Sequence, residues 1–478
     1  MTDWARFDPS TFEGEPEATV QRCFPPNGGF AHNYIAFAAP ITDANAVFHV
    51  PVALSLLAAA APSTLSFPRG RPLPANLYTV LAGPSSSARK TYSIDLGADI
   101  LAAAIPERML HGVQGSDEYL VDFLIDSPHR LIVVREGGSF LASSVERSHL
   151  HQVRKTLTAC FDASPLSRGT IGKRNAKEAR RKDKVPGSTS AATDPARVQS
   201  NPRVSMLLGA TVGDLESYTY AHEWSTGFLS RFHFTLASPE RNYANPLDLD
   251  PVTVTQLVSY LRSMHQIGMP GVCLGFDAKA AEHWCTWQQA LPRKAFGGKA
   301  HASIDRAQLF ALKAALLFAW DRLVFPFVRA AGVVPQGTSS LEAPFYVLEA
   351  DLAPALAFAD VHIRSATTIL QTIAETEIGR QFRRLAAYCA EHASIATYYE
   401  LLRFSDLPQR SFREITETMI ARRELAPYEM GDTKLGYIHV GSLKGEPLDS
   451  ARSRLQERLL RDDYESQMRL GTFQDTAH

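Results

Sequence analysis

The sequence predicts an α/β fold, a parallel sheet with flanking helices, because short continuous apolar runs alternate with helical patterns. The three clearest runs are Leu77 to Leu81, Leu131 to Val134 and the run that begins at Val204, and each ends in small or polar residues. Strands that are buried on both faces have this continuous apolar character. Two helical patterns between Ala31 and Ala61 are expected to support the sheet.

Composition limits the classes of protein that the chain can belong to. The chain has 478 residues, 45% of them hydrophobic, so a large core and two to four domains are expected. The 49 basic and 50 acidic residues nearly cancel, so any nucleic-acid-binding surface has to be local. The five cysteines show no C-x-x-C spacing, which argues against a zinc module and for a reducing compartment.

The N-terminus and the apolar stretches indicate where the protein acts. The first residues lack a basic region followed by an apolar one, which argues against secretion. The longest apolar stretch, Val52 to Pro62, is too short to span a bilayer. We therefore expect a cytoplasmic protein with no membrane partner.

The first apolar run leads into a loop of small residues and then into a helix, as the sequence LYTVLAGPSSSARKTYSID shows. Backbone N–H groups of such a loop can bind a phosphate at the start of the helix. Lys90 would supply a cation and Thr91 a hydroxyl for Mg²⁺. Both framing glycines of G-x-x-x-x-G-K-[ST] are replaced, so a serine-rich turn without a ligand is the alternative. The candidate nucleotide-binding residues are Pro84, Ser85, Ser86, Ser87, Ala88, Arg89, Lys90 and Thr91.

The second apolar run ends in Arg135, Glu136 and two glycines. In a parallel sheet, a strand next to the strand of the phosphate loop would bring its terminal acid beside the phosphates. Glu136 could there polarise the attacking water and contact Mg²⁺. The alternative is a solvated ion pair at the end of a strand.

The region after the second run is strongly basic. Residues 168–184 contain two acidic side chains, Glu178 and Asp183, and the segment is expected to project as a loop or hairpin. Such a run attracts phosphodiester backbones through counterion release, although many charge runs are only solvated. The candidate DNA-binding residues here are Arg168, Lys173, Arg174, Lys177, Arg180, Arg181, Lys182 and Lys184.

Two further candidates follow this basic segment. The third apolar run ends at Thr211, whose hydroxyl could orient a water molecule or a γ-phosphate. Arg231 lies in the sequence GFLSRF, where apolar neighbours would anchor it and leave its guanidinium at a domain edge. An arginine finger is displayed in this way. A structural ion pair is the alternative for Arg231.

Taken in chain order, these motifs resemble those of AAA+ ATPases of the minichromosome maintenance type. In that family, Walker A ends in Ala-Lys-Ser, Walker B ends in Asp-Glu, and a basic hairpin before the sensor strand binds DNA in a central channel. Arg89-Lys90-Thr91, Glu136 and residues 168–184 would occupy these places. Leu229-Ser230-Arg231-Phe232 matches the motif of the family's trans arginine finger. The resemblance implies ATP hydrolysis between subunits of a ring.

The resemblance extends to other positions but also has departures. DRAQLFALKAALLFA resembles the family's sensor 2 helix, with Arg306 at the matching position and Lys313 two turns on. The sensor 1 asparagine is absent, and Thr211 or Asp214 would have to substitute. Arg135 stands where the family has an aspartate that helps to hold Mg²⁺, a departure that bears on metal affinity and on the rate of hydrolysis.

Over most of residues 24–325 the chain is also similar to a group of plasmid- and phage-borne P-loop proteins whose function is poorly defined. The shared features are FPPNGGFAHNYIAFAA, the strand that leads to PSSSARKT, EGGSFLA and GFLSRFHF. Members of that group are often encoded near primases or replication genes. This similarity implies a role in the DNA replication of a mobile genetic element, with a primase or another replication protein as partner.

The C-terminal part predicts a winged helix. Helices are expected over Ile378 to His392, over Ile395 to Phe404 and from about Pro408, followed by a β pair in ELAPYEMGDTKLGYIHV. The third helix would contact DNA in the major groove, although many winged helices bind proteins instead. The basic residues on or beside it are Arg410, Arg413 and Arg422.

These expectations divide the chain into five parts. They are an N-terminal arm with supporting helices (1–75), a P-loop ATPase core (76–265) with a basic insertion (166–200), a helical lid (266–372), a winged helix (373–445) and a helical tail (446–478). The expected function is that of an ATP- and Mg²⁺-dependent, hexameric DNA helicase. The alternatives are a nucleotide-binding, DNA-binding assembly protein with weak or no hydrolysis, and a transcriptional regulator that binds no nucleotide.

Overall fold

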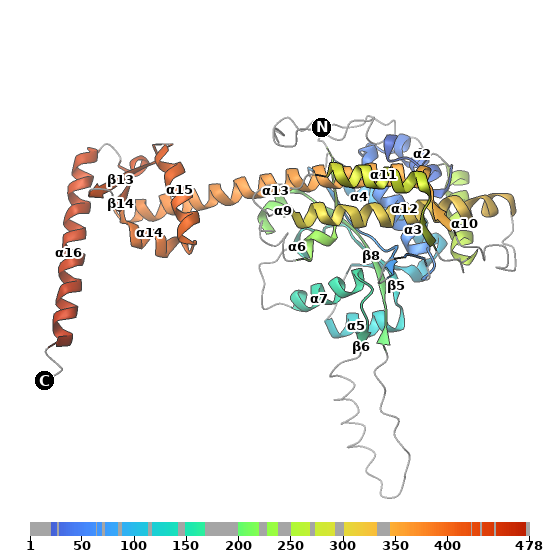
Figure 1. Ribbon diagram of the computed structural model, residues 1–478, viewed down its shortest axis with the longest axis horizontal. Coiled ribbons are helices and arrows are strands. Elements are labelled where there is room, and N and C mark those ends of the chain that lie inside the picture. The colour runs from blue at the N-terminus through green and yellow to red at the C-terminus, as the bar shows by residue number, and fades with distance from the viewer. Residues whose placement is uncertain are drawn as a thin grey trace, which may run out of the picture. The chain divides into compact units, whose positions relative to one another are not determined.

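The chain divides into two compact units, Met1–Ile373 and Ala374–His478, and the division falls within helix α13 (Glu349–Glu391) (Figure 1). No helix among the described residues is long and apolar enough to cross a membrane. The computed structural model describes residues 21–25, 28–63, 65–68, 72–84, 88–112, 117–141, 149–167, 199–218, 227–237, 250–267, 273–291, 301–331, 345–421, 423–430, 433–443 and 446–474.

The first unit is built on a five-stranded parallel sheet with the order β4-β5-β8-β3-β9. The α/β class and the three predicted strands are therefore confirmed. One expectation is wrong: β5 does not adjoin β3, because β8 lies between them. The strands are β3 (Tyr78–Ala82), β4 (Met109–His111), β5 (His129–Val134), β8 (Arg203–Ala210) and β9 (His233–Leu236).

Helices cover both faces of this sheet, as alternate side chains of β3 show. Tyr78 donates a hydrogen bond of 2.7 Å from its hydroxyl to the carbonyl of Leu157 in α7 (His149–Phe161). The hydroxyl of the next residue, Thr79, lies 3.3 Å from Ser55 Oγ of α3 (His49–Ala60). Because successive side chains of a strand point to opposite faces, α3 and α7 lie on opposite sides of the sheet. The whole of β3 is consequently buried.

The predicted supporting helices are α2 (Phe30–Ile41) and α3, and both belong to the core. Helix α2 begins at a buried carboxylate from α12 (His301–Ala331): Asp321 accepts hydrogen bonds from Phe30 N at 2.8 Å and from Ala31 N at 2.9 Å. A Cβ atom at Gly29 would lie 2.5 Å from Asp321 Oδ2, so the approach requires glycine at this position. A helix of the expected lid thus packs directly against the N-terminal part.

Helix α13 lies along the outer edge of the sheet. Phe234 N of β9 donates to His362 Nδ1 at 3.0 Å, and Leu236 N donates to Ser365 Oγ at 2.9 Å. These side chains accept from backbone donors that an edge strand would otherwise leave without partners. Residues expected to form a lid therefore belong to the same compact unit as the sheet, and β10 and β11 within them form a parallel ladder that was not predicted.

The remaining elements of the first unit connect these parts. They are β1 (Ser66–Phe67), β2 (Leu73–Pro74), α4 (Lys90–Ala104), α5 (Asp117–Asp126), α6 (Gly138–Leu141), β6 (Leu166–Ser167), β7 (Gln199–Ser200), α9 (Val212–Tyr218), α10 (Pro251–Ile267), β10 (Cys273–Phe276), α11 (Ala278–Ala290), β11 (Phe345–Val347) and the short 3₁₀ helices η3 (Ala46–Phe48), η4 (Pro106–Arg108) and η6 (Leu229–Arg231).

The second unit contains an antiparallel sheet with the order β12-β14-β13, and helices pack on it. The predicted β pair is present as β13 (Leu425–Met430) and β14 (Thr433–His439). Helix α14 begins later than predicted, because its first expected residues form strand β12 and Thr397 caps the helix together with Glu400. The elements are β12 (Ile395–Thr397), α14 (Tyr398–Ser405), α15 (Gln409–Ala421), η9 (Val440–Ser442) and α16 (Leu448–Gln474).

The predicted helical tail is α16, and its first turns pack on the sheet of its own unit. Ala451 and Leu455 are buried in a cluster with Ile395 and Ile438. Four of the five cysteines are buried, whereas Cys285 is exposed, and all five are free thiols.

Candidate functional site

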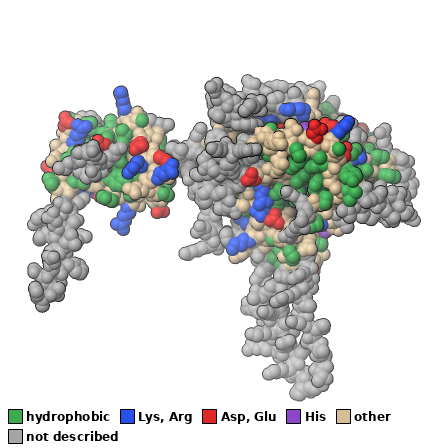
Figure 2. Space-filling model, in the orientation of Figure 1, with side chains coloured by type: hydrophobic (Ala, Val, Ile, Leu, Met, Phe, Trp, Pro, Cys, Tyr) green, Lys and Arg blue, Asp and Glu red, His purple; other side chains and the backbone are tan. Residues whose placement is uncertain are grey.

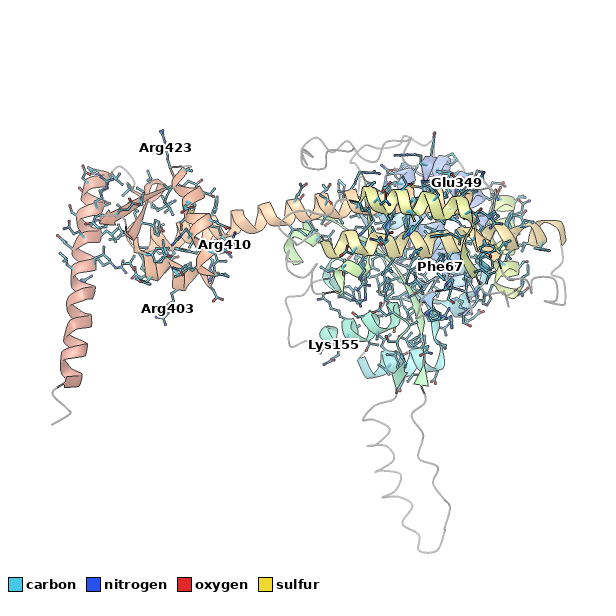
Figure 3. All side chains as sticks on the ribbon, in the orientation of Figure 1. Phe67, Lys155, Glu349, Arg403, Arg410 and Arg423 are labelled. Atoms are coloured by element: carbon cyan, nitrogen blue, oxygen red, sulfur yellow. The ribbon has the colours of Figure 1, made fainter. Side chains whose placement is uncertain are left out.

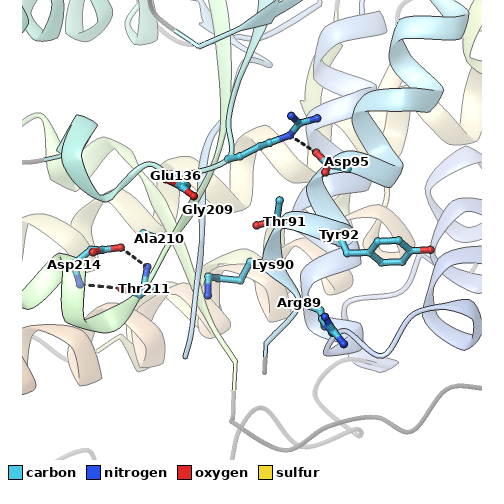
Figure 4. A pocket seen from close by; sticks show the side chains of 11 residues that line it. Arg89, Lys90, Thr91, Tyr92, Asp95, Glu136, Gly209, Ala210, Thr211 and Asp214 are labelled. Atoms are coloured by element: carbon cyan, nitrogen blue, oxygen red, sulfur yellow. Dashed lines mark hydrogen bonds and ion pairs between the residues drawn. The ribbon is translucent and has the colours of Figure 1, made fainter. Parts of the chain in front are cut away.

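A pocket of about 610 Å³ opens at the carboxyl ends of β5 and β8 and at the start of α4 (Figure 4). In open parallel sheets, ligands bind beyond this edge of the strands. The pocket brings together several predicted site residues that are far apart in the sequence. Its lining consists of Arg89, Lys90, Thr91, Tyr92, Asp95, Arg135, Glu136, Gly209, Ala210, Thr211 and Asp214.

The predicted phosphate loop is held by its own lysine. Lys90, the first residue of α4, donates from Nζ to Gly83 O at 2.9 Å and to Pro84 O at 2.7 Å. Its side chain is buried, and burial lowers the pKa of Lys90, whereas the Asp214 carboxylate acts in the opposite direction. When an anion binds, the Lys90 ammonium can donate to its oxygens in place of the carbonyl oxygens of Gly83 and Pro84. Of the other loop residues, Pro84 and Ala88 do not line the pocket, and residues 85–87 lie outside the described ones.

The residue before the lysine has an unusual backbone conformation. Arg89 has φ 48°, in the left-handed region, where a side chain is tolerated but uncommon. Its guanidinium forms an ion pair with Asp43, with an Nε to Oδ2 distance of 2.8 Å. Arg89 thus lines the pocket but already has an anionic partner.

Glycines fix the position of Glu136, and sequence reasoning did not assign them this role. Gly137 N donates to Gly209 O at 2.5 Å, and a Cβ atom at Gly209 would lie 2.6 Å from Arg135 O. A Cβ atom at Gly138 would lie 2.4 Å from Asp214 Cβ. The loop after β5 therefore packs directly against the end of β8, with the exposed Glu136 carboxylate at the pocket. The two glycines after Glu136 are the signal that could have indicated this contact.

Thr211 caps the short helix α9. Its Oγ1 accepts from Asp214 N at 3.0 Å, and Asp214 Oδ2 accepts from Thr211 N at 3.3 Å. This reciprocal arrangement holds both side chains beside the pocket (Figure 4). The hydroxyl hydrogen of Thr211 is not used in this exchange, so the group can still donate to a ligand.

The end of β5 carries an ion pair, as expected in the alternative to a catalytic role for Glu136. Arg135 forms this pair, and Glu136 takes no part in it. Arg135 Nε lies 2.6 Å from Asp95 Oδ1 on α4, and the side chains are 55% and 32% exposed. Glu136 makes no hydrogen bond or ion pair with another residue in the described part of the chain. The carboxylate of Glu136 therefore remains open to a ligand.

Arg231 and Arg306 lie away from this pocket. Arg231 precedes β9, at the amino edge of the sheet, and is only 11% exposed. Its Nη2 lies 2.6 Å from Asp162 Oδ2, and its Nη1 donates to Gly227 O. Arg306 Nη1 lies 3.9 Å from the same carboxylate. The ion pair that was the alternative for Arg231 is therefore present, with Asp162 of the same chain as the partner.

A buried lysine completes this second cluster, a role that sequence reasoning missed. Lys313 Nζ donates to Asn76 O at 2.8 Å and to Asn76 Oδ1 at 2.9 Å, and it lies 3.8 Å from the centre of the Phe161 ring. Burial lowers the pKa of Lys313 well below its ordinary value, and Asp162 opposes this effect. Lys313 thus ties α12 to Asn76, two residues before the start of β3.

The predicted DNA-binding residues lie in two places. The basic residues of 168–184 are outside the described residues, but the flanking strands β6 and β7 pair antiparallel, so residues 167 and 199 lie side by side. In the second unit, Arg410 and Arg413 of α15 are exposed, and Arg410 pairs with Glu414 at 3.1 Å. Arg422 is outside the described residues. Figure 2 shows Lys and Arg side chains on the surface of this unit. Two that were not predicted, Arg403 and Arg423, are exposed and project from it (Figure 3).

A single Mg²⁺ ion fits the chemistry of the pocket. The described residues contain no group of three or more His, Cys, Asp or Glu side chains that could hold a metal ion by themselves. Mg²⁺ in nucleotide sites needs only one or two protein oxygens, because phosphates and water supply the others. The Thr91 hydroxyl and the Glu136 carboxylate line the same pocket and can serve in this way.

Comparison of the chain with protein-family models and with curated proteins gives no match.

Proposed function

We propose that the protein is an ATP-dependent DNA helicase or translocase of a mobile genetic element, and that the pocket at the carboxyl edge of its sheet binds ATP with Mg²⁺. The observation that carries the proposal is the meeting of Lys90, Thr91, Glu136 and Thr211 in one pocket, although they come from three separate parts of the sequence. A cation, a hydroxyl, a free carboxylate and a second hydroxyl are the groups that phosphoryl transfer to water requires.

Each side chain has a separate task in this proposal. The Lys90 ammonium exchanges the carbonyls of Gly83 and Pro84 for phosphate oxygens. The Thr91 hydroxyl would help to hold Mg²⁺, which would supply positive charge beside the phosphates. Glu136 accepts a hydrogen bond from the attacking water and polarises it, and Thr211 donates to the water or to the terminal phosphate.

The remaining parts of the proposal concern assembly and DNA. The chain forms a ring, a hexamer by its resemblance, in which Arg231 of one copy stabilises charge at the pocket of the next. Arg231 must then exchange Asp162 for the phosphate of the neighbouring site. The helices after residue 266 act as the lid. The second unit acts as a winged helix that contacts DNA through Arg410 and Arg413. The basic segment 168–184 contacts the DNA backbone. A primase or another replication protein is the proposed partner.

An ATPase assay with the full-length chain tests the proposal. We expect hydrolysis that single-stranded DNA stimulates, and loss of turnover in Glu136→Gln with ATP binding retained. Lys90→Ala should lose binding itself, because it removes the only ammonium that lines the described part of the pocket. Lys155→Ala is the matched control, since this exposed lysine does not line the pocket (Figure 3). Absence of nucleotide binding by the unaltered chain would refute the proposal.

A second function is favoured by Arg135 and by the pairing of Arg231. An assembly protein that binds ATP and DNA but hydrolyses ATP weakly needs no strand-end aspartate and no displayed arginine. In that case ATP promotes DNA binding, whereas Glu136→Gln leaves both ATP affinity and DNA affinity unchanged. DNA-stimulated turnover in the unaltered chain decides for the helicase.

A further inference from the structure

The ion pair between Arg135 and Asp95 reverses the usual placement of charge at the end of β5. Arg135 occupies the position at which the resembled family has its metal-binding aspartate. Its side chain reaches Asp95 of α4, where its Nε lies 2.6 Å from Asp95 Oδ1. The pocket therefore has a cation on the strand and a carboxylate on the helix.

Asp95 is placed on the same side of α4 as Thr91. The two residues are four positions apart in one helix, so their Cβ atoms are neighbours at about 5–6 Å. Both line the pocket, together with Glu136. Within the described part of the chain, Arg135 engages only Oδ1 of Asp95, which leaves Oδ2 as an acceptor.

A purely structural role explains this pair poorly. Both side chains are substantially exposed, and exposed pairs contribute only about 0–1 kcal/mol to stability. Mg²⁺ in nucleotide sites, in contrast, is held by one or two carboxylates in addition to phosphates and water. A carboxylate fixed one helical turn from Thr91 can provide such an oxygen.

We infer that Asp95 supplies the carboxylate that the end of β5 lacks, as an oxygen ligand of Mg²⁺ or of its water shell, and that Arg135 positions it. This inference rests on the proposed function, because it concerns the metal that accompanies the nucleotide. It explains how the site can retain Mg²⁺ although Arg135 replaces the aspartate. The carboxylate moves from the strand to the helix, and the arginine becomes its anchor.

The test measures how nucleotide binding depends on Mg²⁺, not turnover. A fluorescent ATP analogue is titrated into the full-length chain at a series of Mg²⁺ concentrations. Asp95→Asn should raise the half-saturating Mg²⁺ concentration roughly tenfold or more, the usual effect of losing such a group near a metal. In the presence of a chelator, Asp95→Asn and the unaltered chain should bind the ATP analogue with equal affinity.

Asp99→Asn is the matched control. Asp99 is exposed one turn further along α4 and does not line the pocket, so its loss should leave the Mg²⁺ response unchanged. Thermal melting of both variants establishes that they fold. An Asp95→Asn protein with the Mg²⁺ response of the unaltered chain would overturn the inference.

A second experiment exchanges the two charged residues of the ion pair. Asp95→Arg combined with Arg135→Asp restores the pair and returns the carboxylate to the strand end. The double variant should recover the Mg²⁺ response that Asp95→Arg alone loses, and failure to recover it overturns the inference. If the unaltered chain binds no nucleotide at any Mg²⁺ concentration, both the inference and the proposed function fail. Mg²⁺-dependent binding that is unaffected by Asp95→Asn refutes the inference alone.

Discussion

The buried carboxylate of Asp321 should make the stability of the first unit depend on pH. Asp321 is fully buried and accepts hydrogen bonds from the first two N–H groups of α2. Burial raises the pKa of Asp321 from 3.8 to about 7, against the effect of these two donors. The ionised form therefore costs free energy in the folded chain that it does not cost in the unfolded chain.

The sign and size of the effect follow from this difference. Because the folded pKa lies above the unfolded one, the contribution to stability is fully present below pH 3.8 and is lost as the pH rises to about 7. Each pH unit in this window corresponds to about 1.4 kcal/mol, so the folded state loses about 3–4 kcal/mol between pH 4 and pH 7. Asp321→Asn cannot ionise and lacks this dependence.

Urea denaturation followed by circular dichroism measures the effect. The free energy of unfolding is compared for the unaltered chain and Asp321→Asn at several pH values between 4 and 7.5. Since all other titrating groups are shared, the difference between the two proteins isolates residue 321. We expect this difference to shift by about 3–4 kcal/mol in favour of the variant as the pH rises. A difference that stays constant across the range would refute the reasoning.

Three further substitutions test other contacts. Gly209→Ala places a Cβ atom 2.6 Å from Arg135 O, so we expect the loop with Glu136 to shift and ATP turnover to fall at least tenfold while ATP binding persists. Lys313→Met leaves two Asn76 oxygens without their donor and should lower the free energy of unfolding by about 1–3 kcal/mol. Arg231→Lys cannot reproduce the fork of contacts to Asp162 and Gly227 and should lower the thermal midpoint by a few degrees.

Each of these substitutions has a control or a contradicting result. Gly213→Ala, with the nearest non-neighbouring atom 3.9 Å from its Cβ position, should be neutral for turnover, and equal effects at positions 209 and 213 would contradict the close-packing argument. Lys279→Met, at an exposed position of α11, is the control for Lys313→Met. An Arg231→Lys chain with an unchanged midpoint would show that the pairing with Asp162 contributes little.

The sequence predicted β3, β5 and β8 well, because each is a continuous apolar run, the pattern of a strand that is buried on both faces of a sheet. It also singled out Lys90, Thr91, Glu136 and Thr211, which line one pocket: the first two begin the helix after β3, and the others follow the ends of β5 and β8. The order of strands was not predictable in the same way. Nothing in the run from Val204 indicates that it inserts between β3 and β5, because that choice depends on how the crossover helices pack.

The partners of the ion pairs between distant segments were not predicted either. Asp162 is an unremarkable residue at the end of α7, and only the tertiary structure brings it to both Arg231 and Arg306. Strand β12 was read as part of a helix, since three residues are too few for a periodic signal. These differences arise where contacts between distant segments, not local patterns, decide the outcome.

The capping of β9 by α13 limits how copies of this chain can join. Its N–H groups at residues 234 and 236 already donate to His362 and Ser365. A neighbouring molecule consequently cannot extend the sheet by adding a strand at that margin without first displacing a helix. Any assembly that includes this region has to be built from side-chain contacts. The cover by α13 also protects β9 from the edge-to-edge association that leads to aggregation.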